Sequence, residues 1–300
     1  SNDRKMEKKS FSPPVPDGNP TPAAEAAAGR PDVYPTWRDT LSMVGMYFLL
    51  SVVVGLIFAP FGADKGGLPL FLMYVTTFAL LIGFSLYLKK QKTGDLKGIL
   101  HFSIRGFSPG IILWGVILML AVGVVIEPLT DLFPDEWMRQ LNRTISGTGG
   151  WAMVTAVVAA PVCEEVFFRG ILQDGLTRKY GGWQGILLAS FIFGAIHLVP
   201  QQVVGGTLIG VVIGYVYYRT RSLLSAIVLH AINNSLALFS MLLMEDESVT
   251  VRQAVGSDTV YYVIYAVAVL LVALSLVRVV TLVRQGKFRR GETDAEWKRL

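Results

Sequence analysis

The chain has 300 residues, of which 52% are apolar and only 16% are charged. A soluble domain carries about 25% charged residues, so this composition excludes an ordinary soluble globule. The net charge is +5, but the lysines and arginines stand in short loops and near the chain ends, where a membrane topology needs them, so we expect no nucleic-acid partner. The single cysteine, Cys163, excludes an internal disulfide and a Cys-rich metal site.

Residues 1–36 lack apolar periodicity. Charged residues at the start are followed by Pro-rich and Ala-rich sequence, a composition typical of a disordered segment. The segment also lacks the apolar core of a cleavable signal peptide. We therefore expect a disordered N-terminal tail at 1–36, a transmembrane helical domain at 37–290 and a cytosolic C-terminal tail at 291–300.

The rest of the chain is a succession of apolar segments. A helix needs to span roughly 30 Å of hydrocarbon, at about 1.5 Å per residue. The segments lie at 41–61, 68–88, 109–129, 151–172, 183–199, 203–218, 223–244 and 260–283. The fifth and sixth are short, so one of them is expected to be tilted or re-entrant. The sequence predicts an all-α, polytopic transmembrane helix bundle of about eight spans, with the lipid bilayer as its surroundings.

The charges between the segments predict the orientation of the bundle. Basic loops alternate with acidic or neutral ones. The basic loops lie at 89–97, 178–179, 219–221 and 284–290, and the acidic ones lie at 131–136 and 245–247. Because cytosolic loops carry the excess of Lys and Arg, both termini are predicted to be cytosolic. The protein is expected to be an integral, multi-pass protein of the plasma membrane.

Two further patterns concern packing. A short interfacial helix is expected within 133–150, where Trp137 begins an amphipathic stretch. In the sixth segment, Gly206, Gly210 and Gly214 recur at four-residue spacing. Small residues at this spacing let helix backbones approach closely, so these glycines predict a packing seam.

Polar side chains inside apolar spans are energetically costly, so each is expected to have a structural or functional role. In the fourth segment, Glu164 and Glu165 are adjacent, and Arg169 follows four residues after Glu165. Glu165 and Arg169 share a helix face and are expected to pair. Glu164 lies on a different face without a local partner, and Pro161 is expected to kink the helix beside it. The structural alternative is a group of charges at the membrane edge, although such residues are usually Lys or Arg.

Two other segments carry polar groups that suit the same chemistry. Phe193 lies one turn before His197 in the fifth segment, and His230 and Asn234 share one face of the seventh. Their structural alternatives are an interfacial histidine and polar contacts between helices. Together with Glu164, these residues suggest an internal site on three helices. Glu164, near His197, could deprotonate a water that attacks a peptide carbonyl, while His230 and Asn234 donate hydrogen bonds to the oxyanion.

These residues resemble the three motifs of the CAAX protease and bacteriocin-processing family, also called CPBP or Abi. In this chain, the motifs are Glu164-Glu165-Val-Phe-Phe-Arg169, Phe193-Gly-Ala-Ile-His197 and His230-Ala-Ile-Asn-Asn234. The resemblance covers residues 151–244, which we expect to form the catalytic core. It implies a membrane-embedded endopeptidase of the type II CAAX prenyl protease kind. It assigns water activation to Glu164 and His197, oxyanion stabilisation to His230 and Asn234, and a supporting role to Glu165 and Arg169.

Three alternatives stay open at this point. The family has also been described as metalloproteases, and Glu164, His197 and His230 could supply three ligands to Zn²⁺; the metal-free mechanism is favoured because the metalloprotease motif His-Glu-x-x-His is absent. The substrate is expected to be a protein or peptide, with or without a prenyl group. A non-enzymatic binding, immunity or transport protein could use the same polar cluster, but the sequence has no evident inverted repeat.

Overall fold

The computed structural model describes residues 33–61, 67–97, 100, 106–147, 149–243 and 250–286. Within these ranges all regular secondary structure is helical, as predicted. The helices are α2 (Trp37–Phe58), η1 (Ala59–Phe61), α3 (Leu68–Thr93), α4 (Pro109–Thr130), α5 (Glu136–Gly147), α6 (Gly150–Val154), η2 (Thr155–Ala159), α7 (Ala160–Phe167), η3 (Phe168–Gln173), α8 (Asp174–Tyr180), α9 (Gly182–Ala195), α10 (Pro200–Thr220), α11 (Leu223–Leu243), α12 (Val251–Val255) and α13 (Asp258–Gln285).

Seven helices of the described chain are long and apolar enough to cross a membrane. They correspond to seven of the eight predicted spans. The remaining one, α9, has 14 residues, which rise only about 21 Å, short of the hydrocarbon thickness. The prediction that the fifth span is short is therefore confirmed, whereas the prediction that the sixth is short is wrong, because α10 has 21 residues. The cytosolic position of both termini stays a prediction.

The fourth span differs most from its predicted form. It is a continuous helix, Gly150–Tyr180, that runs 31 residues and continues two turns beyond the predicted end at 172. Two π-helical segments, η2 and η3, interrupt its α-helical geometry. Pro161 follows η2 by two residues and cannot donate the hydrogen bond that a regular helix needs. The predicted irregularity near Pro161 thus takes the form of a π-bulge.

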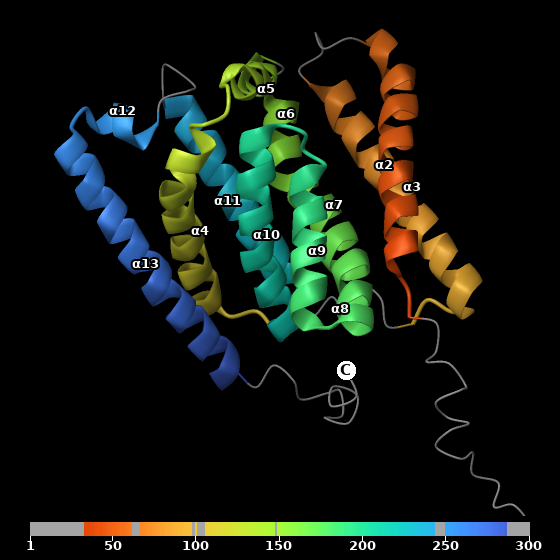
Figure 1. Ribbon diagram of the computed structural model, residues 1–300. Coiled ribbons are helices and arrows are strands. Elements are labelled where there is room, and N and C mark those ends of the chain that lie inside the picture. The colour runs from red at the N-terminus through yellow and green to blue at the C-terminus, as the bar shows by residue number, and fades with distance from the viewer. Residues whose placement is uncertain are drawn as a thin grey trace, which may run out of the picture. The chain divides into compact units, whose positions relative to one another are not determined.

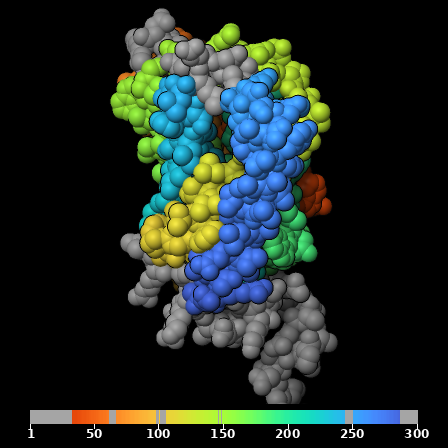
Figure 2. Space-filling view, turned by 90° about the vertical axis from the view of Figure 1, so that its left-hand side faces the viewer, coloured from red at the N-terminus to blue at the C-terminus, as the bar shows by residue number. Residues whose placement is uncertain are grey.

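The spans pack side by side around this long helix (Figure 1). The hairpin of α2 and α3 lies on one side and contacts α6, η2 and α7 through α3. On the other side, α10 and α11 contact α4, and α4 in turn packs against α13. Figure 2, which faces the α13 side, shows α13 crossing over α4 with α11 beside them.

Two buried apolar clusters make up the core. One joins α2 and α3 to the long helix and α9 through side chains that include Met43, Phe78, Phe168 and Phe193. The other joins α4, α10, α11 and α13. The long helix lies between the two clusters. Apolar packing therefore flanks the face that this helix turns toward α10 and α11.

The helical fold begins slightly before the first predicted span. Tyr34 is buried, and its hydroxyl donates a hydrogen bond of 2.6 Å to the Ser85 carbonyl on α3. Thr36 and Asp39 form a capping box at the start of α2, which satisfies donors that a helix N-terminus leaves free. Residues 1–32 and 287–300, where most of the predicted tails lie, are outside the described residues.

The short helix predicted within 133–150 is present as α5, with Trp137 on its exposed side. Its contact with a membrane surface stays a prediction.

The predicted glycine seam is confirmed where α9 meets α10. A Cβ atom on Gly210 would lie 3.1 Å from the Cβ of Ser190, and one on Gly206 would lie 3.4 Å from the Cα of Gly194. The closest approach is at Gly194 itself, where a Cβ would come nearest to the Thr207 Oγ1 and would lie 2.5 Å from the Val203 carbonyl oxygen. The distances at Gly194 leave no room for a Cβ and the distance at Gly210 is tighter than usual contact, whereas 3.4 Å at Gly206 is ordinary van der Waals contact.

Replacing Gly194 with Ala tests this seam. Because the added methyl group meets backbone atoms of α10, the Gly194→Ala variant should lose about 1–3 kcal/mol of folding free energy. Gly205→Ala is the matched control, since its nearest neighbour would be the Cδ1 of Ile126 at 4.0 Å. Thermal unfolding of the purified proteins in detergent should show a lower Tm for Gly194→Ala alone; an equal Tm in both variants would contradict the seam.

Candidate active site

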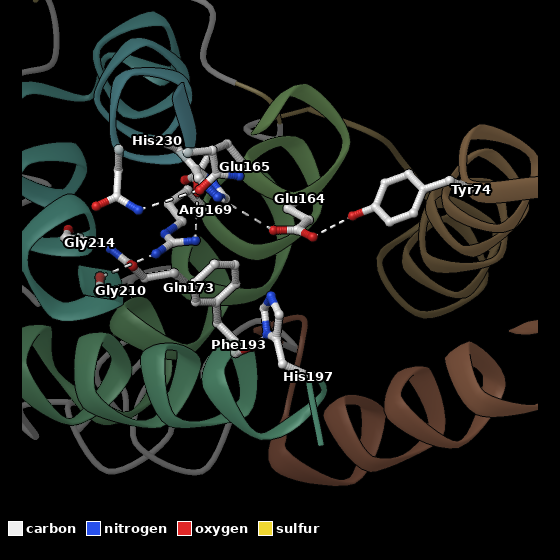
Figure 3. Close-up of polar contacts among 12 residues, drawn as sticks. Tyr74, Glu164, Glu165, Arg169, Gln173, Phe193, His197, Gly210, Gly214 and His230 are labelled. Atoms are coloured by element: carbon white, nitrogen blue, oxygen red, sulfur yellow. Dashed lines mark hydrogen bonds and ion pairs between the residues drawn. The ribbon is translucent and has the colours of Figure 1, made fainter. Parts of the chain in front are cut away.

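The predicted site residues come together in one region between the long helix, α9 and α11 (Figure 3). Glu164 and Glu165 lie on α7, and Arg169 lies in the π-helical segment η3. His230 and Asn234 lie on α11. Phe193 lies on α9, whereas His197 lies in the turn that follows α9. Glu164, Glu165 and His230 are all at most 5% exposed.

The expected pair of Glu165 and Arg169 is present and fully buried. The Arg169 Nη1 donates to Glu165 Oε1 at 2.9 Å. The Arg169 Nη2 donates to the carbonyl of Gly210 at 3.2 Å, and its guanidinium lies over the ring of Phe193 at 4.6 Å. One turn further along the same face, Gln173 donates to the carbonyl of Gly214 at 2.8 Å. Because Gly210 and Gly214 have no side chains, Arg169 and Gln173 of the long helix can reach the backbone of α10.

His230 lies between the two glutamates. Its Nδ1 is 2.7 Å from Glu165 Oε1, and its Nε2 is 3.7 Å from Glu164 Oε2. The ring of Phe193 packs edge-on against the imidazole, with 5.5 Å between ring centroids. An ionised carboxylate only accepts hydrogen bonds, so the contact with Glu165 keeps a proton on Nδ1. Glu165 therefore fixes both the orientation of His230 and the position of its Nε2 beside Glu164.

Glu164 has a partner that the sequence did not indicate. The hydroxyl of Tyr74 on α3 donates a hydrogen bond to Glu164 Oε1, while Oε2 has no hydrogen-bond partner among the described residues. Tyr74 stands in an apolar span, where a tyrosine usually finds a partner for its hydroxyl. The sequence gives no more specific indication, because Glu164 lies 90 residues from Tyr74 in the chain.

His197 does not contact Glu164 directly. Its Nδ1 lies 2.9 Å from the carbonyl oxygen of Phe193 on α9, and its ring packs edge-on against the ring of Phe193, with 5.3 Å between ring centroids. Since the carbonyl occupies Nδ1, the Nε2 atom is left to face the site. Figure 3 shows the imidazole pointing toward the space beside Glu164.

Asn234 satisfies a backbone group in the π-bulge. Its Nδ2 donates to the carbonyl of Ala156 at 2.9 Å. In η2, the Ala160 N–H bonds to the Thr155 carbonyl, and the next residue, Pro161, has no N–H for Ala156. Asn234 supplies the missing donor and keeps a second N–H on the same amide group.

The described residues contain no group of three His, Cys, Asp or Glu side chains placed to hold a metal ion. Zinc binding by Glu164, His197 and His230 stays a prediction, and no step of the mechanism is routed through a metal.

Breaking the buried ion pair should cost stability. The Arg169→Met variant leaves Glu165 buried without its cation, which should lower the folding free energy by about 3–5 kcal/mol. Arg139→Met is the control, because Arg139 pairs with Asp135 and Glu136 on the exposed helix α5, and such surface pairs contribute less than about 1 kcal/mol. Unfolding in detergent, followed by circular dichroism, measures the difference. Similar losses of folding free energy in the two variants would contradict a larger contribution of the buried pair.

Comparison with known proteins finds a family model that spans the region of this site. The family model described as Rce1-like, type II CAAX prenyl endopeptidase, matches residues 147–236. The matched range contains every motif residue from Glu164 to Asn234, but not Tyr74. No curated protein and no solved structure was found to match the chain. Together with the apolar spans, the match indicates an integral, multi-pass membrane protein. Residues 147–236 thus match an Rce1-like type II CAAX prenyl endopeptidase domain, and this match supports an intramembrane endopeptidase at the level of the family.

Proposed function

We propose that the protein hydrolyses a peptide bond within the membrane by means of a water molecule activated by Glu164. The observation that carries this proposal is the state of the Glu164 carboxylate. Its Oε1 accepts from Tyr74, whereas its Oε2 is buried, has no hydrogen-bond partner in the described chain and lies 3.7 Å from His230 Nε2. A buried carboxylate oxygen of this kind is suited to take a proton.

In the proposed reaction, Glu164 Oε2 takes a proton from water, and the oxygen of that water attacks the scissile carbonyl carbon. His197 holds the water through its free Nε2. As the tetrahedral intermediate collapses, Glu164 returns the proton to the leaving amine, so the enzyme ends in its starting state. The reaction consumes one water and yields a new carboxyl and a new amino terminus.

The developing oxyanion requires hydrogen-bond donors. We assign this role to His230 and Asn234. Asn234 uses one N–H for Ala156 and retains another. His230 donates Nδ1–H to Glu165 and, when doubly protonated, has Nε2–H available for the oxyanion. Glu165 and Arg169 hold His230 and the helix in place.

For the substrate, the family match favours a protein that ends in a prenylated CAAX sequence, from which the enzyme would release the last three residues. Other membrane-associated peptides are the alternative. The plasma membrane as location and the cytosol as the side of both termini belong to the same proposal.

Glu164→Gln tests the mechanism with a nearly isosteric change. Loss of the general base should lower kcat for a quenched fluorescent, farnesylated CAAX peptide by at least about 100-fold. Glu136→Gln, on the exposed surface of α5, should cleave like the unmodified protein. Wild-type activity in Glu164→Gln would rule out the proposed base. If the folded wild-type protein cleaves no peptide of a broad library, the alternative of a binding, immunity or transport protein gains support.

Removal of metal ions tests whether the glutamate acts alone. If Glu164 and His197 activate water directly, a zinc chelator should leave the cleavage rate unchanged. The control is the same chelator saturated with Zn²⁺ beforehand. Loss of activity with the free chelator, restored by added Zn²⁺, would instead assign the activation of water to a bound metal.

A further inference from the structure

The Tyr74–Glu164 contact joins two parts of the chain that the sequence motifs do not connect. Tyr74 lies on α3, outside the matched range 147–236. Helix α3 packs directly against α6, η2 and α7. This packing brings the Tyr74 hydroxyl to Glu164 Oε1 (Figure 3), and the phenol ring is held in turn by Phe78, at 5.0 Å between ring centroids.

Among the described residues, Tyr74 is the only hydrogen-bond donor to the Glu164 carboxylate. The neighbouring charges have other partners. Glu165 and Arg169 bond to each other, and His230 bonds to Glu165 through Nδ1. Cys163 lies beside Glu164 in sequence, and Tyr47 on α2 faces the same carboxylate without a hydrogen bond to it. Without Tyr74, the orientation of the Glu164 carboxylate would therefore have no fixed support.

The two carboxylate oxygens of Glu164 are made unequal by this contact. The hydrogen bond from Tyr74 occupies Oε1, and a hydrogen bond to a charged acceptor is among the stronger ones in proteins. Oε2 is left facing His230 Nε2 at 3.7 Å. A general base must meet its water within a narrow range of geometry, and small displacements are costly in rate.

We propose that Tyr74 is a positioning residue of the active site: its hydroxyl fixes the Glu164 carboxylate so that Oε2 alone acts as the base. The inference rests on the proposed function. It adds that the α2–α3 hairpin takes part in forming the site, and that the matched domain by itself lacks the group that orients its base.

A purely structural role makes a different prediction. If the Tyr74 hydroxyl only satisfies a buried carboxylate, Tyr74→Phe lowers the Tm and leaves the kcat of the folded protein unchanged. If Tyr74 positions the base, Tyr74→Phe lowers kcat while KM changes little, because the lost interaction serves the transition state rather than substrate binding.

The experiment measures kcat, KM and Tm of the full-length protein in detergent, with a quenched, farnesylated CAAX peptide as the probe. For Tyr74→Phe we expect kcat to fall about 10- to 100-fold, with KM within about 3-fold of the wild-type value. Tyr87→Phe is the matched control, since it also loses one hydroxyl from α3 but its side chain is 60% exposed. Its kcat should stay within about 2-fold of wild type.

Including Glu164→Gln separates the two ideas. If Glu164→Gln is inactive while Tyr74→Phe matches Tyr87→Phe in kcat, the role of Tyr74 is overturned and the proposed function stands. If Glu164→Gln remains active, or if the wild-type protein cleaves nothing, both are overturned. A fall of kcat in Tyr74→Phe alone, with a Tm close to that of Tyr87→Phe, supports the positioning role.

Discussion

Charged side chains are costly in the interior of an apolar bundle unless each has a partner, and the long helix Gly150–Tyr180 carries several of them. Arg169 meets this constraint with three contacts: the Glu165 carboxylate, the Gly210 carbonyl and the Phe193 ring. These contacts fix α9 and α10 relative to the long helix. Through Glu165 they also fix His230 on α11. The geometry of the site therefore depends on one buried ion pair.

The backbone of the bundle is adapted to the same site. Glycines on α10 expose carbonyl groups that Arg169 and Gln173 use as acceptors. The π-bulge η2 leaves the Ala156 carbonyl without its helical donor, and Asn234 supplies one. In both places a backbone group is paired with a side chain from a neighbouring helix, which links the position of the polar residues to the packing of the spans.

Much of this arrangement could be predicted from the sequence. The apolar segments gave most helix bounds within a few residues, because apolar length is a direct requirement of the bilayer, and four-residue spacing correctly paired Glu165 with Arg169. Contacts between distant helices could not be derived in this way. Two hydrogen bonds have no signal in the neighbouring sequence: the one from Tyr74 to Glu164 and the one from Asn234 to the Ala156 carbonyl. The predicted closeness of His197 to Glu164 agrees with the imidazole pointing toward the space beside Glu164, but the contact of His197 Nδ1 with the Phe193 carbonyl had no signal in the sequence.

The difference between the two adjacent glutamates follows from their partners rather than from their burial. Both are almost inaccessible. Glu165 is neutralised by Arg169 and shared with His230, so a proton transferred to it would break two strong contacts. Glu164 accepts one hydrogen bond, from the neutral hydroxyl of Tyr74, and its Oε2 has no hydrogen-bond partner among the described residues, with His230 Nε2 at 3.7 Å. A proton can therefore be taken up by Glu164 and released again at little structural cost. This asymmetry is the physical reason to assign acid–base chemistry to Glu164 and support to Glu165.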